Sequence, residues 1–113
     1  MKIEVKGRHV AVTDEIREKI EKRFEKVGKQ VSELATLEVE LSEEKNPAIA
    51  DSQVAEATIY LKGGTLRAHE ASPDMLHSIH ELAEDIRRQV KRHREKRRGR
   101  ARSRRTTGRL KRA

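Results

Sequence analysis

Polar and apolar residues alternate in several short stretches of this chain, and one longer stretch repeats with a helical period. Ile3 and Val5 alternate with polar residues and are followed by Gly7, which predicts a short first strand. From residue 13 to residue 34, apolar side chains recur every three or four positions, as on one face of a helix. This apolar stripe consists of Ile16, Ile20, Phe24, Val27, Val31 and Leu34. Thr13 is suited to cap the start of the helix.

Three further strands are predicted in the middle of the chain. The alternation over residues 37–41 predicts a strand with one solvated face, and two more strands are expected over residues 54–61 and 65–71. Gly63-Gly64 lies between the last two and predicts the tight turn of a hairpin. Residues 42–52 have no period and are expected to form a loop.

A second helix is predicted to begin at Ser72-Pro73-Asp74, which offers a capping hydroxyl, a proline for the first helical position and an acid for the first turn. Its apolar stripe consists of Met75, Ile79, Leu82, Ala83, Ile86 and Val90, and Gly99 is a candidate end. The predicted order is β-α-β-β-β-α. It indicates an α+β fold in which two helices pack on one face of a four-stranded, mainly antiparallel sheet, as in double-stranded-RNA-binding domains.

The positive charge is concentrated at the C-terminal end of the chain. Residues 91–113 hold 13 Lys and Arg against the single acid Glu95, a net charge of +12, whereas residues 1–90 have a net charge of −4. Such an asymmetry is typical of a chain with one end that contacts a polyanion. We therefore expect a folded domain over residues 1–98 and a basic tail, disordered when free, over residues 99–113.

Composition argues against several classes of protein. There is no cysteine, which excludes a disulfide framework and a cysteine-based zinc site, and no apolar run is long enough for a membrane span. A soluble, cytoplasmic protein that is monomeric when free and uses no cofactor is expected. We find no constellation typical of an enzyme. His77, His80 and Glu84 share one face of the second helix, so a metal-dependent enzyme stays open as an alternative, although such histidines are usually only solvated.

A helical projection at about 100° per residue places the bases of each predicted helix on one flank. In the first helix this flank holds Lys19, Lys22, Arg23, Lys26 and Lys29. In the second it holds Arg87, Lys91, Arg94 and Arg98. If the helices pack side by side, the two basic flanks border a common surface. Since the chain has few aromatic residues, contacts to phosphate and sugar are favoured over base stacking. For the first helix there is an alternative, in which its paired charges only solvate its surface. The basic segment also lacks an apolar face for a membrane.

Five segments follow one another in order over residues 2–98 and carry a resemblance to a known family: residues 5–9, 12–17, 54–59, 64–68 and 74–90. Together they resemble the ribosome hibernation factors, which include the hibernation promoting factors and the ribosome-associated inhibitor, also called protein Y. No single motif is diagnostic, but the whole succession is specific.

The resemblance implies a non-catalytic domain that binds the small ribosomal subunit near the decoding centre, in the channel that mRNA and tRNA otherwise occupy. It implies rRNA and ribosomal proteins as partners, competition with mRNA and tRNA, and protection of idle ribosomes under stress or in stationary phase. The family's RNA contacts come from bases on both helices. Together with the basic flanks, the expected rRNA-binding residues are Arg17, Lys19, Lys22, Arg23, Lys26, Lys29, Arg87, Arg88, Lys91, Arg92, Arg94, Lys96, Arg97 and Arg98.

Two positions depart from the family's pattern. Leu76 stands where members commonly have Tyr, and Asp85 stands where many have Lys, which weakens the expected contact there. Long members carry a linker and a dimerisation domain that this sequence lacks, so the resemblance does not imply that ribosomes dimerise. The alternative function is a general RNA-binding protein or RNA chaperone without specificity for ribosomes.

Overall fold

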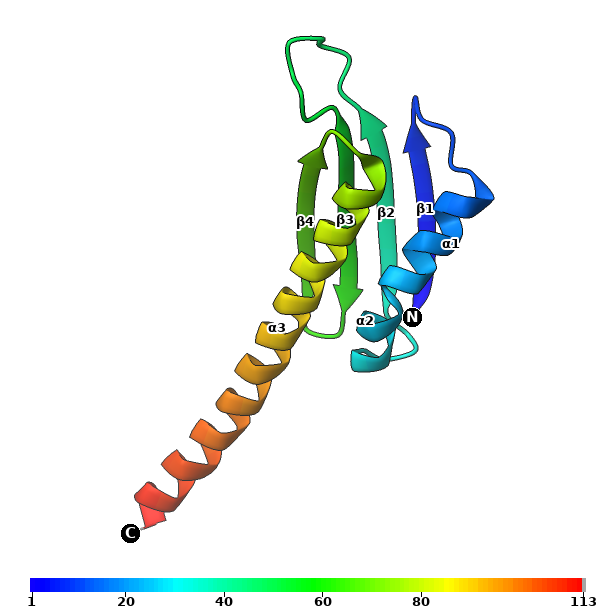
Figure 1. Ribbon diagram of the computed structural model, residues 1–113. Helices are drawn as coiled ribbons and strands as arrows, with labels where there is room; N and C mark the ends of the chain where they lie inside the picture. Colours follow the sequence, from blue (N-terminus) through cyan, green and yellow to red (C-terminus); the bar gives the residue numbers. More distant parts are fainter. Residues whose placement is uncertain (113) are drawn as a thin grey trace.

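Four strands form one sheet, and helices cover one of its faces (Figure 1). This computed structural model describes the secondary structure of residues 1–112 and the side chains of residues 1–98. The elements in chain order are β1 (Lys2–Arg8), α1 (Asp14–Arg23), α2 (Glu25–Gln30), β2 (Thr36–Glu43), β3 (Gln53–Leu61), β4 (Gly64–Ser72) and α3 (Met75–Arg112). The α+β fold expected from the sequence is confirmed.

The strands lie side by side in the order in which they follow along the chain, β1-β2-β3-β4. β1 pairs with β2 in parallel, because α1 and α2 carry the chain back across the sheet before β2 begins. The other two pairs are antiparallel, and Gly63 turns the chain between β3 and β4 with a φ of 89°, which glycine adopts without strain. The sheet is therefore mainly antiparallel, as predicted.

The core lies between the covered face of the sheet and the helices. Its largest fully buried side chains are Phe24, Ile20, Leu37, Leu41, Ile59, Ile79, Leu82, Ile86, Val27, Val39 and Val90. The whole apolar stripe predicted for the second helix is buried there. Each large apolar side chain removed from water in this way contributes about 1.5–3 kcal/mol to folding, so the stripe fixes which face of α3 meets the sheet.

The first predicted helix is wrong in its length and continuity. Its axis breaks at Phe24, which separates α1 from α2, although the amide of Gly28 still donates to the carbonyl of Phe24 and keeps the helical phase. α2 ends at Gln30, because the hydroxyl of Ser32 accepts the amide of Leu34 and forms a turn. Leu34, which was expected in the core, is consequently 92% exposed.

The start of α3 also differs from the prediction. Asp74 caps the helix, with its carboxylate accepting the amide of His77 at 3.3 Å, so the capping residue is not Ser72. Ser72 is buried instead, and its hydroxyl lies 2.7 Å from the hydroxyl of Ser78. Ser78 donates to the carbonyl of Gln53 at 2.7 Å, which ties the first turn of α3 to the start of β3.

α3 projects far beyond the sheet (Figure 1). Val90 is its last residue buried in the core, yet the helix runs through Gly99 to Arg112, so the end expected at Gly99 is wrong. A glycine inside a helix costs only about 1 kcal/mol relative to alanine, and the neighbouring Arg and Ala residues favour a helix. The boundary at residue 98 and the disorder of residues 99–113 in the free protein stay predictions.

Candidate nucleic-acid interface

α1 and α2 lie beside α3 on the covered face of the sheet, and three contacts fix which flanks face each other (Figure 1). Gly28 of α2 lies near Met1, so that flank is turned toward β1 and away from α3. The opposite flank carries Gln30, which lines a hollow together with Arg94 of α3. On α3, the side chain of Gln89 donates to the carbonyl of Arg67 at 2.8 Å, so the flank with Gln89 faces β4.

These contacts bring six bases together along the line where the helices meet. The helical period places Lys19, Arg23 and Lys26 on the flank that faces α3, and Arg87, Lys91 and Arg94 on the flank that faces α1 and α2. All six side chains are exposed. We call this set the interhelical basic strip. It offers a row of donors and positive charge to a polyanion.

The other predicted site residues lie outside this strip. Arg92 and Lys96 are on the flank of α3 that is turned toward β4, and Arg88 points away from the sheet. Arg17 is on the flank of α1 turned away from α3. Lys22 and Lys29 project into solvent, where Lys29 lies 3.9 Å from Glu25. Arg97 donates to the carbonyl of Lys62 at 2.9 Å, and Arg98 is exposed on the part of α3 beyond the core.

One acidic residue is hydrogen-bonded to a base of the strip. Glu84 lies beside the strip and accepts a hydrogen bond from Arg87 at 2.8 Å. This hydrogen bond lowers the pKa of Glu84, because it stabilises the ionised carboxylate. Glu84 is therefore charged at neutral pH and offsets part of the charge of Arg87.

The face of the sheet that no described helix covers largely pairs its own charges. It carries four acids on three strands, Glu4, Glu38, Glu40 and Glu56. Lys2 lies 3.3 Å from Glu4, and Arg8 lies 3.3 Å from Glu40. Lys6 and Arg67 are the other two bases of this face. This open face is thus close to charge balance, in contrast to the strip.

The metal-dependent alternative finds no site in the described residues. His77 lies 4.0 Å from Glu81, and Glu84 is hydrogen-bonded to Arg87. Within residues 1–98, no group of three or more His, Asp or Glu side chains could hold a metal ion. None of the helices described is long and apolar enough to cross a membrane.

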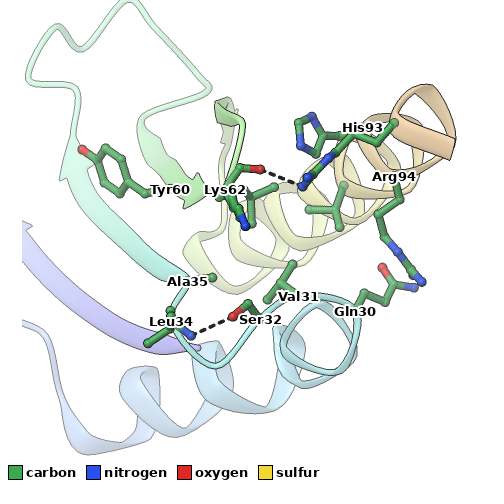
Figure 2. A pocket seen from close by; sticks show the side chains of 12 residues that line it. Gln30, Val31, Ser32, Leu34, Ala35, Tyr60, Lys62, His93 and Arg94 are labelled. Atoms are coloured by element: carbon green, nitrogen blue, oxygen red, sulfur yellow. Dashed lines mark hydrogen bonds between the residues drawn. The ribbon is translucent and has the colours of Figure 1, made fainter. Parts of the chain in front are cut away.

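A hollow of about 580 Å³ lies next to one end of the strip, between the end of α2, the turn that joins β3 to β4, and α3 (Figure 2). Arg94 belongs to both the strip and the hollow. Sequence reasoning missed this feature, because its walls come from three segments that are far apart in the chain. Neither Gln30 nor Lys62 stood out as a candidate, and no local pattern marks them.

Comparisons with known proteins extend over nearly all of this fold. Residues 3–98 match the family described as Sigma 54 modulation protein / S30EA ribosomal protein. A ribosome hibernation promotion factor of Picosynechococcus sp. is 36% identical over 97 residues, which cover 85% of this chain and 50% of that protein. This chain thus corresponds to half the length of that relative.

A shorter relative and a solved structure agree with this match. The ribosome hibernation promoting factor of Acinetobacter guillouiae is 29% identical over 99 residues, with 83% of this chain and 88% of that protein covered. The crystal structure of the Thermus thermophilus Protein Y N-terminal domain superposes with a TM-score of 0.70 at 29% identity, covering 82% of this chain and 99% of that one. The family's members are not enzymes, in agreement with the sequence analysis. This chain therefore belongs to the Sigma 54 modulation protein / S30EA ribosomal protein family, the family of the ribosome hibernation promoting factors.

Proposed function

We propose that this chain is a ribosome-binding inhibitor of translation. It occupies the mRNA and tRNA channel of the small subunit near the decoding centre and keeps idle ribosomes inactive and protected, in the cytoplasm, under stress or in stationary phase. The names of its relatives support the ribosome as the partner. The observation that carries the proposal is the interhelical basic strip, which collects positive charge from two separate helices at one surface.

The strip suits the backbone of folded RNA better than its bases. Phe24 is fully buried, and Tyr60 lines the hollow at one end of the strip and donates its hydroxyl to Glu38, so no aromatic ring belongs to the strip itself. Lys and Arg side chains without neighbouring aromatic rings bind phosphates and read shape, not sequence. rRNA offers such phosphates in a fixed three-dimensional arrangement, which two helices at a fixed spacing can recognise.

The basic residues on the projecting part of α3 favour a binding site inside an RNA channel, and not one on a single flat RNA surface. Arg94 and Arg98 lie on one flank of this helix, and Lys96 lies on the opposite flank. A duplex approached from one side would meet only one of these flanks. A channel with RNA on more than one side would use both, which agrees with placement inside the small subunit.

The test is binding to small subunits and competition with their ligands. We expect co-sedimentation that decreases steeply with salt, because each neutralised phosphate releases counterions. We also expect the protein to compete with mRNA and with A- and P-site tRNA, and to leave a chemical footprint in the channel. Free exchange of tRNA in the presence of bound protein would contradict the proposal. Equally tight binding to free duplexes would favour a general RNA-binding protein.

A matched pair of variants tests whether the strip is the contact surface. One variant replaces three strip bases with glutamine, Lys19, Arg23 and Lys26. The control replaces three exposed bases elsewhere, Lys6, Lys45 and Arg67, so that both variants lose the same charge. The strip variant should lose co-sedimentation at moderate salt, and the control should keep it. Equal losses would show that net charge alone drives binding.

A further inference from the structure

The hollow beside the strip has an apolar lining and a basic rim (Figure 2). Val31, Ala35, Leu61 and Val90 supply the apolar lining. Its volume of about 580 Å³ is within the range of about 300–1,000 Å³ that is usual for small-molecule sites. A hollow of this kind favours a ligand with an apolar, flat part.

The charges at the rim favour an anionic ligand. Lys62, Arg94 and Arg97 line the hollow, and none of its lining residues is acidic. Arg97 uses one guanidinium nitrogen to donate to the carbonyl of Lys62 at 2.9 Å, which holds this side chain over the hairpin turn. A phosphate at the rim would thus meet three cations with no opposing carboxylate.

Two lining residues have polar atoms that lack a partner. The side-chain oxygen of Gln30 and the Nε2 of His93 are buried without a hydrogen bond within the described structure. These atoms are covered in this conformation, so a ligand that brings its own donors and acceptors pairs with them only after the two side chains rotate toward the hollow. The edge of a nucleobase carries both hydrogen-bond donors and hydrogen-bond acceptors.

We propose that this hollow takes one unpaired nucleotide of an RNA. The base enters between Val31 and the exposed Leu34, its edge meets Gln30 and His93, and its phosphate lies against Arg94 and Lys62. Continuity favours RNA over an acidic peptide, because Arg94 is shared with the strip and an RNA bound there reaches the hollow. Tyr60 also lines the hollow, so the base can pack against this ring as well as against aliphatic side chains and a guanidinium (Figure 2).

The proposal rests on RNA binding by the strip, and it adds that the protein prefers RNA with an unstacked base. The test compares two labelled RNA hairpins with equal numbers of phosphates, one fully paired and one with a single unpaired nucleotide. Since stacking one base contributes about 1–3 kcal/mol, we expect the bulged hairpin to bind at least about fivefold more tightly in fluorescence anisotropy. Equal affinities for the two hairpins would overturn the proposal.

Paired variants separate the hollow from general electrostatics. Arg94→Gln should abolish the preference for the bulged hairpin, whereas Lys45→Gln removes the same charge from the loop between β2 and β3, outside the hollow, and should keep it. Leu34→Ala should likewise lower the preference, and Leu76→Ala, which truncates an exposed leucine outside the hollow, should not. If Arg94→Gln and Lys45→Gln weaken both hairpins alike, the hollow has no role.

The hairpin-binding experiment does not depend on whether the protein binds ribosomes. A preserved preference for the bulged hairpin without co-sedimentation would leave the hollow as an RNA site and overturn the proposed function. Co-sedimentation with ribosomes, without any preference for the bulged hairpin, would support the proposed function and overturn the RNA site in the hollow.

Discussion

Arg87 donates a hydrogen bond to Glu84 at 2.8 Å, one turn earlier on α3. This is the one close ion pair that the described structure records for a base of the interhelical basic strip. Because both side chains are partly exposed, the pair contributes little to stability, but it reduces the positive charge that the strip presents. Glu84 thus limits the affinity of the strip for phosphates.

Glu84→Gln should therefore strengthen RNA binding. The substitution frees the guanidinium of Arg87 and removes a negative charge beside the strip. We expect the affinity for a folded RNA to increase about two- to fivefold at low salt, which corresponds to the free energy of one exposed ion pair. Glu81→Gln is the control, since Glu81 faces His77 on another flank of α3. An unchanged affinity for Glu84→Gln would mean that phosphates do not reach Arg87.

The salt dependence of binding should identify the individual strip residues. Lys26→Gln should reduce the slope of log affinity against log salt by about 1, since one phosphate contact is lost. Lys45→Gln removes the same charge from the loop between β2 and β3 and should leave the slope unchanged. The measurement is a titration of one RNA at several salt concentrations. Identical slopes for the two variants would exclude Lys26 from the contact surface.

Truncation after Arg98 should weaken ribosome binding without moving the protein. The removed segment holds seven bases, so the truncated chain should show a lower affinity and a shallower salt slope. The footprint on the small subunit should be unchanged, because the strip remains. A control chain with the order of residues 99–113 shuffled should restore the affinity if charge alone matters. A displaced footprint would assign site selection to the tail.

Ser78→Ala should destabilise the fold. The hydroxyl of Ser78 is fully buried and donates to the carbonyl of Gln53 at 2.7 Å, so its removal leaves that carbonyl short of a donor. We expect the free energy of unfolding to fall by about 1–3 kcal/mol in urea denaturation. Ser42→Ala, on the open face of β2, should change it by less than about 0.5 kcal/mol. A similar effect of both variants would contradict the role of the Ser78 bond.

Tyr60 should titrate above the ordinary tyrosine pKa of about 10. Its hydroxyl donates to Glu38 at 3.2 Å, and this hydrogen bond raises the pKa of Tyr60 because ionisation would lose the bond and place two negative charges together. The small stabilisation is present below the unfolded pKa and is lost as pH rises through the raised folded value. Tyr60 is the only tyrosine, so absorbance follows it directly. Glu38→Gln should lower the pKa toward the ordinary value; an unchanged titration would show that the bond does not form.

Periodicity predicted the parts of the fold that are determined by burial. The stripe from Met75 to Val90 was placed correctly, because burial of these apolar side chains determines which face of α3 packs on the core. Leu34 has the same spacing from Val31 as true core residues, but the turn at Ser32 ends the helix first. Spacing alone cannot distinguish these cases. The end at Gly99 failed for a related reason, since the small cost of one glycine does not decide where a helix stops.

The candidate site could be predicted only in part. The sequence places bases on both helices, but which flank of the first helix faces α3 is determined only by the packing of α1 and α2 against β1 and α3. The hollow could not be predicted, because Val31, Leu61 and Val90 come together only when the sheet and both helices have formed. Resemblance to known relatives supplied the partner, which no residue pattern in this chain specifies.

The near balance of charge on the open face of the sheet also affects how fast the protein finds its target. A polyanion attracts the side with the helices and gains little from the face where Lys2 and Arg8 are already paired with acids. The molecule therefore approaches with a preferred orientation, and unproductive encounters through the sheet are short-lived. The ion pairs that contribute least to stability would in this way raise the fraction of collisions that lead to binding.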